Sequence, residues 1–143
     1  MAKSHLHELT ERGQSVWFDT LSRALVHTGG LARMMDEDAV TGVTSNPTIF
    51  QKALSEGDAY DAQLKELVGT VDDPTQIFFA LALDDIRDAC DVLRPAFDSS
   101  GGVDGFVSME VEPGIAYDTK KLATEETRVG SPPPAIRRSS PRR

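Results

Sequence analysis

Four polar residues able to bind or deprotonate a substrate stand at or near the ends of three short apolar segments. They are Asp19, Thr44, Asn46 and Glu110. The segments have the apolar character of buried parallel strands, and Asn46-Pro47 ends the second one because that pair reads as a turn. In a parallel α/β barrel, the carboxyl ends of all strands converge on one face. We therefore expect these side chains to share one pocket at that face.

Each of these residues also has a purely structural interpretation. Asp19 can cap a helix that follows its strand, Asn46 can form an Asx turn, and Thr44 is a good β-former. For Glu110 the structural interpretation requires a partner, because an unpaired carboxylate is costly within an apolar strand. These alternatives stay open at the level of the sequence.

The elements that must position these side chains follow from the periodicity of the chain. Helices are expected over 4–12, 21–26, 31–37, 48–55, 60–67 and from Pro74 onward, and strands over 15–19, 40–44 and from Asp104. The long helix has the clearest start, with Asp73 as cap, Pro74 in the first helical position and Gln76 completing a capping box. The pattern indicates the α/β class and a partial (β/α)8 TIM barrel of about three parallel strands, since a closed barrel needs roughly 200 residues.

The packing of such a partial barrel can also be anticipated. We expect Trp17 in the core, but partial exposure of the apolar strand residues that lose their neighbours, namely Val16, Phe18, Val43, Phe106 and Val107. The open strand edges predict marginal stability and self-association. Residues 130–143 contain four prolines and four arginines without apolar periodicity, so we expect a structured portion, 1–129, and a disordered tail.

Charge and composition exclude several classes of protein. Removing the four tail arginines from the 15 basic residues leaves 11 against 23 acidic ones, so residues 1–129 carry a net charge of −12. Such an acidic body disfavours binding to nucleic acids and to anionic membranes. A single cysteine, Cys90, indicates a reduced, buried thiol and a cytoplasmic protein. No phosphate-binding glycine loop and no metal-ligand spacing is present, so neither a nucleotide nor a metal cofactor is expected.

The chain resembles the N-terminal part of a transaldolase over roughly residues 4–128. The resemblance is carried by Val16-Trp17-Phe18-Asp19, by Gly42-Val43-Thr44-Ser45-Asn46-Pro47-Thr48-Ile49-Phe50, by Gly105-Phe106-Val107-Ser108-Met109-Glu110-Val111 and by Ala116-Tyr117-Asp118-Thr119. Their combination is specific, although each would be weak alone. For the complete enzyme it implies a cofactor-free transferase of the pentose phosphate pathway. That enzyme moves a dihydroxyacetone unit from a ketose phosphate, such as sedoheptulose 7-phosphate, to glyceraldehyde 3-phosphate.

The same resemblance implies a role for each site residue. A lysine on the fourth strand of the family forms a Schiff base with the ketose. Asp19 matches the aspartate that handles the proton of the hydroxyl whose carbon becomes an aldehyde. Glu110 matches the glutamate that acts through a water in forming the imine. Asn46 matches a residue that holds substrate hydroxyls, with Thr44 beside it.

The lysine-bearing strand of the family has no counterpart in this sequence. Val129 is followed by the Pro/Arg-rich tail, and none of the five lysines lies in an apolar strand: Lys3, Lys52, Lys65, Lys120 and Lys121. We therefore expect a truncated or frameshifted fragment that is inactive alone. Two alternatives remain: a binding or assembly module that pairs with another polypeptide supplying the remaining strands, and a weak sugar-binding site.

Overall fold

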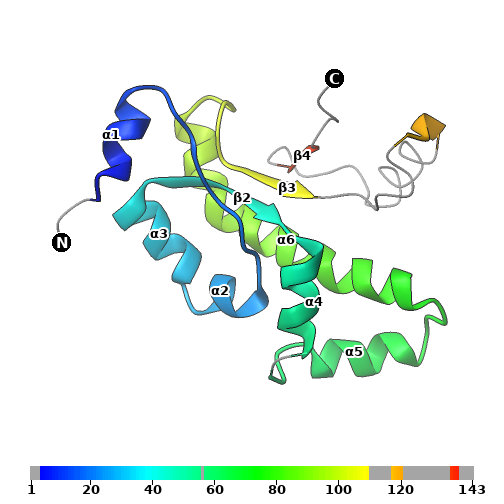
Figure 1. Cartoon of the computed structure of the whole chain (residues 1–143). Coiled ribbons are helices and arrows are strands. Elements are labelled where there is room, and N and C mark those ends of the chain that lie inside the picture. Colours follow the sequence, from blue (N-terminus) through cyan, green and yellow to red (C-terminus); the bar gives the residue numbers. More distant parts are fainter. Residues whose placement is uncertain (1–3, 56, 110–116, 121–135, 139–143) are drawn as a thin grey trace.

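The computed structural model describes residues 4–55, 57–109, 117–120 and 136–138 (Figure 1). Within this part of the chain, one parallel sheet has the strand order β1-β2-β3-β4. Its strands are β1 (Val16–Phe18), β2 (Val40–Ser45), β3 (Phe106–Met109) and β4 (Ile136–Arg138). The first three are the predicted strands, and their parallel pairing through helical connections confirms the α/β class and agrees with a partial TIM barrel.

β4 lies in the segment for which the sequence predicts disorder. Ile136–Arg138 pair in parallel with Val107–Met109 of β3. Backbone N–H and C=O groups along the edge of a strand favour pairing with any extended segment nearby, and this short segment occupies the outer edge of β3. The disordered tail stays a prediction, because the structure describes only these three residues of 130–143.

Six helices accompany the strands in the described ranges. They are α1 (Leu6–Glu11), α2 (Arg23–His27), α3 (Gly30–Asp38), α4 (Pro47–Ser55), α5 (Asp61–Val68) and α6 (Pro74–Ser99). Each lies where a helix is predicted, and α6 begins at the predicted proline. The carboxylate of Asp73 accepts hydrogen bonds from the Thr75 N–H at 2.9 Å and from the Gln76 side chain at 3.3 Å. The Gln76 amide thus reaches the side chain of the cap, where a capping box would use its backbone.

A layer of helices, α2, α3 and α6, covers one face of the sheet (Figure 1). The core between them consists of Leu21, Val26, Leu31, Val40, Val43, Ile86, Ala89, Cys90, Leu93 and Val107. Val43 and Val107 are 0% exposed, and Phe106 is buried with its ring edge-to-face on an aromatic ring of α6. The expectation of exposure is wrong for these three residues, because α6 packs on Val43 and Val107 and its Phe97 ring contacts Phe106. Val16 and Phe18 are partly buried, as expected.

Trp17 lies on the opposite face of the sheet and is 37% exposed. Side chains alternate along a strand, and its neighbours Val16 and Phe18 both pack on the helix-covered core. The core position expected for Trp17 is therefore wrong. Its indole instead covers Gly42 of β2, where an added Cβ would lie 2.4 Å from Trp17 Cε2. Only a residue without a side chain permits this approach.

A second apolar cluster joins α4, α5 and the first half of α6, beyond the carboxyl end of β2 (Figure 1). Its buried members are Phe50, Tyr60, Leu81 and Ala82. The ring of Phe50 meets those of Tyr60 and Phe78 edge-to-face, with centroids 5.6 and 5.2 Å apart. Such contacts stabilise beyond the area they bury, so this cluster holds the connection between β2 and β3 together. Among the helices of the described ranges, none has the length and apolar character that crossing a membrane requires.

Candidate functional site

The carboxyl ends of β1 and β2 bring two of the predicted site residues together. Asp19 follows directly after β1, and the parallel register sets Trp17 beside Gly42 and Phe18 beside Val43. Continuing this register by one residue places Asp19 beside Thr44, and the Thr44 hydroxyl donates a hydrogen bond to Asp19 Oδ1. Both side chains lie on the face that also carries Trp17, opposite the helix layer. A carboxylate oriented by a hydroxyl at this position can accept a proton from a bound substrate.

Asn46 lies at the start of α4 and takes the structural role left open by the sequence. Its side-chain Oδ1 accepts the Thr48 N–H at 3.0 Å, and its carbonyl oxygen accepts the Phe50 N–H at 2.9 Å. The first of these bonds closes an Asx turn that caps the helix. The chemical role expected for Asn46 remains a prediction.

Glu110 lies outside the described residues, and its role remains a prediction. The described part of β3 ends at Met109, and Ser108 pairs with Thr44 in the parallel register. The third expected strand is thus beside the second, in the order that a shared pocket requires.

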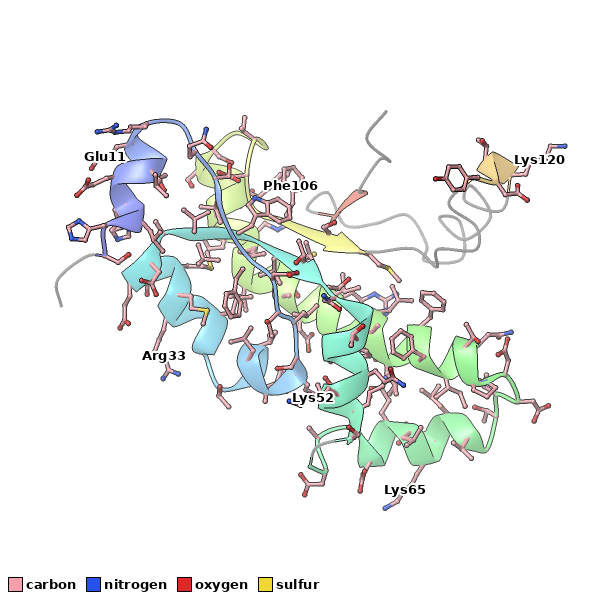
Figure 2. The ribbon with its side chains drawn as sticks, in the orientation of Figure 1. Glu11, Arg33, Lys52, Lys65, Phe106 and Lys120 are labelled. Carbon is pink, nitrogen blue, oxygen red and sulfur yellow. The ribbon has the colours of Figure 1, made fainter. Side chains whose placement is uncertain are left out.

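The described lysines lie on helices or in the short segment 117–120. Lys52 is in the last turn of α4 and Lys65 in the last turn of α5, and Figure 2 shows Lys65 and Lys120 at the periphery, away from the strands. None of β1 to β4 contains a lysine. Lys3 and Lys121 lie outside the described residues. The strands that the structure describes thus present no amine for Schiff-base chemistry.

A buried polar cluster around Arg23 is the feature that sequence reasoning missed. Arg23 Nε donates to Asp85 Oδ1 at 2.8 Å, and the Tyr60 hydroxyl donates to Asp85 Oδ2 at 2.6 Å. Asp85 is 1% and Tyr60 4% exposed. One feature of the sequence could have indicated this cluster. Asp85 falls on the apolar face of α6, four residues after Leu81 and three after Ala82, and a charge buried there needs partners.

The ionisation of this cluster follows from its burial. Burial raises the pKa of the Asp85 carboxyl above its ordinary value, and hydrogen bonds from Tyr60 and Arg23 oppose that rise. Burial also raises the pKa of the Tyr60 phenol, as does its hydrogen bond to Asp85. The phenol therefore stays protonated and remains a donor to Asp85 across the neutral range.

An open surface depression of about 320 Å³ borders the cluster. It is lined by Arg23, His27, Gln63, Asp84, Arg87 and Asp88. These side chains bond to one another or to Asp85: His27 Nε2 lies 2.8 Å from Asp88 Oδ2, and Arg87 donates to Asp84 at 3.0 Å. The described residues contain no group of three or more His, Cys, Asp or Glu placed to hold a metal ion.

The comparisons with known proteins identify the family of this chain. Residues 16–129 match the family described as transaldolase/fructose-6-phosphate aldolase. A transaldolase of Parafrankia sp. is 48% identical over 120 residues, covering 84% of this chain and 32% of the relative. A transaldolase of Mycobacterium ulcerans is 50% identical over 119 residues (83% and 32%), and one of Mycobacterium tuberculosis is 49% identical over 117 residues (82% and 31%). This chain spans about a third of the length of these relatives. It belongs to the transaldolase/fructose-6-phosphate aldolase family.

Proposed function

We propose that residues 16–129 form the first part of the active site of a cytoplasmic, cofactor-free transaldolase. The complete enzyme would transfer a dihydroxyacetone unit from a ketose phosphate, such as sedoheptulose 7-phosphate, to glyceraldehyde 3-phosphate in the pentose phosphate pathway. The hydrogen bond from Thr44 to Asp19 carries this proposal, because it sets an oriented carboxylate at the carboxyl ends of two adjacent parallel strands. Family membership supports the reaction class.

In the proposed reaction, a lysine supplied by a later barrel strand attacks the ketose carbonyl, and loss of water gives an imine. The carbon–carbon bond next to the imine then breaks, and its electron pair moves into the imine. Asp19 accepts the proton of the hydroxyl that becomes the aldehyde carbonyl, and Thr44 holds that carboxylate in place. Glu110 assists the loss of water, and Asn46 donates to hydroxyls of the bound unit.

A chimaera tests these roles in a complete barrel. The aligned segment of the Mycobacterium tuberculosis transaldolase is replaced by the matching segment of this chain, with which it is 49% identical. We expect turnover, and we expect Asp19→Asn to lower kcat by at least about 100-fold, the usual contribution of a positioned acid–base group. Asp72→Asn is the matched control, since Asp72 is exposed and precedes α6. A folded chimaera whose kcat is unchanged by Asp19→Asn would contradict the assignment.

For the 143-residue chain alone, the proposal is that it is catalytically defective. Support comes from the strands β1 to β4, none of which contains a lysine. Incubation with a ketose phosphate followed by borohydride reduction traps any Schiff base as a mass increase. We expect no stoichiometric adduct. Peptide mapping that finds one lysine fully modified would overturn the proposal.

The alternative role is an assembly module that pairs with a second polypeptide carrying the remaining strands, or with another copy of itself. Two observations favour it: Trp17 is 37% exposed on the sheet face opposite α2, α3 and α6, and β1 is an edge strand in the described sheet order. Sedimentation at increasing concentration measures self-association. If Trp17→Lys leaves any observed association unchanged, the contact does not involve this face.

A further inference from the structure

The link between β1 and α2 determines where Asp19 is held. β1 ends at Phe18 and α2 begins at Arg23, so Asp19 lies in a connection of four residues. Leu21 in this connection is buried in the core, and the Ser22 hydroxyl caps α2 by accepting the Leu25 N–H at 3.2 Å. A connection this short has little freedom once both of its ends are fixed. The attachment of Arg23 therefore limits, through this connection, where Asp19 can lie.

Arg23 is held by four acceptors drawn from two other parts of the chain. Its backbone N–H donates to the Tyr60 hydroxyl at 3.0 Å. Its guanidinium donates to Asp85 Oδ1 at 2.8 Å, to the Ala59 carbonyl oxygen at 3.1 Å and to Gln63 Oε1 at 2.6 Å. The guanidinium carbon also lies 4.3 Å from the centre of the Tyr60 ring. A planar fork with several fixed donors makes this pattern possible, and a lysine amine cannot reproduce it.

These acceptors belong to the connection between β2 and β3. Ala59, Tyr60 and Gln63 lie at the start of α5 or within it, and Asp85 lies in α6, which leads to β3. Arg23 thus ties the segment after β1 to the segment after β2, across 37 residues to Tyr60 and 62 residues to Asp85. Asp19 and Thr44 are the polar residues at the strand ends that these segments follow.

We infer that Arg23, held by Tyr60 and Asp85, is a positioning residue that fixes the Asp19 carboxylate against the Thr44 hydroxyl. The inference rests on the proposed function for the chemical role of Asp19. The arrangement of Arg23, Asp19 and Thr44 does not depend on whether the chain turns over a substrate. Arg23 touches no reacting atom in this scheme, and it acts by fixing the connection that carries Asp19.

The test measures the side-chain rotamer of Thr44 by nuclear magnetic resonance in the 143-residue chain. Three-bond couplings from the Thr44 methyl carbon to its backbone nitrogen and carbonyl carbon report whether one staggered rotamer is populated. We expect one rotamer in the unsubstituted chain and averaging over several in Arg23→Lys. Arg87→Lys is the matched control, since Arg87 forms an exposed pair with Asp84 on the same helix, and it should preserve the single rotamer.

A second variant separates positioning from general loss of structure. Tyr60→Phe keeps the ring and removes the hydroxyl that joins the Arg23 backbone to Asp85. It should also produce averaging at Thr44 while the resonances of Val43 and Val107 stay in place. A single Thr44 rotamer in both variants, averaging in the unsubstituted chain, or collapse of the whole spectrum in both variants would each overturn the inference. An inactive chimaera with a rigid Thr44 would instead count against the proposed function alone.

Discussion

The Tyr60 hydroxyl donates a 2.6 Å hydrogen bond to Asp85 Oδ2, and both side chains are buried. A buried carboxylate is tolerated only when donors satisfy its oxygens, and here Arg23 supplies the donor to the other oxygen. The three residues therefore act as one unit. Different measurements can still test each of them, because Tyr60 has a phenol, Asp85 a carboxyl and Arg23 a guanidinium group.

The first prediction concerns ionisation of the Tyr60 phenol. The chain has two tyrosines, and Tyr117 is fully exposed. In a Tyr117→Phe variant, the near-ultraviolet absorbance change of phenolate should report Tyr60 alone. We expect it only well above pH 10, the ordinary value for tyrosine, and together with unfolding, because burial raises the pKa of Tyr60. Ionisation near pH 10 in a chain whose circular dichroism is unchanged would show that the phenol is not buried against Asp85.

The second prediction concerns the pH dependence of stability. The folded-state pKa of Asp85 is raised, so the folded chain holds this proton more tightly than the unfolded chain, whose pKa is near about 3.9. Its contribution to the free energy of unfolding is then largest below about pH 4 and decreases as pH rises through the raised pKa. Asp85→Asn removes this proton, so the stability of the unsubstituted chain relative to the variant should fall as the pH rises above about 4.

Urea unfolding of both chains across this range is the measurement. Asp84→Asn serves as control, since Asp84 lies on the same helix and is half exposed. If the stability of the unsubstituted chain relative to Asp85→Asn is constant or increases with pH, the pKa of the Asp85 carboxyl is not raised in the folded chain.

The third prediction concerns the contact between Trp17 and Gly42. A methyl group at position 42 would lie 2.4 Å from Trp17 Cε2, so Gly42→Ala must displace the indole. We expect a loss of about 1–3 kcal/mol in the free energy of unfolding, as for other overpacked sites, and a shift in the fluorescence of this single tryptophan. Gly69→Ala is the control, because the nearest atom to its added Cβ is 3.7 Å away. Equal stability of the two variants would argue against the contact.

The parts of the fold with local signals could be predicted from the sequence. Asp73 and Pro74 predict the start of α6. Asp73 accepts a hydrogen bond from an N–H group of the first turn, and Pro74 has a backbone angle that suits the first helical position, so neither depends on the rest of the chain. The approach of Asp19 to Thr44 also could be predicted, because parallel strands connected by helices place their carboxyl ends side by side.

The parts that depend on packing between distant segments could not be predicted. Val16, Trp17 and Phe18 are all apolar, so the sequence does not show which of them face the helix layer, and a core position for Trp17 does not follow from it. The contact of Arg23 with Asp85 spans 62 residues. The position of Asp85 on an apolar helix face indicates that it needs a partner, but not which cation provides it.

The last prediction uses Cys90 to measure how tightly the chain is packed. Cys90 is the single cysteine, is 0% exposed, and burial raises its pKa to about 11. A thiol reagent near neutral pH needs an accessible thiolate, so labelling requires the helix layer to open. A net stability of about 5 kcal/mol would make labelling at least about a thousandfold slower than in urea-unfolded chain.

The labelling rate discriminates between the core in the structure and the weak packing expected from sequence alone. A slow rate that increases with urea along with the unfolding transition would show that Val43, Val107 and Cys90 form a stable interior. A rate close to that of the unfolded chain would show that the helix layer opens freely without further strands. Asp85→Asn, measured under the same conditions, reports whether the Arg23 cluster and this core open together, since α6 carries both Asp85 and Cys90.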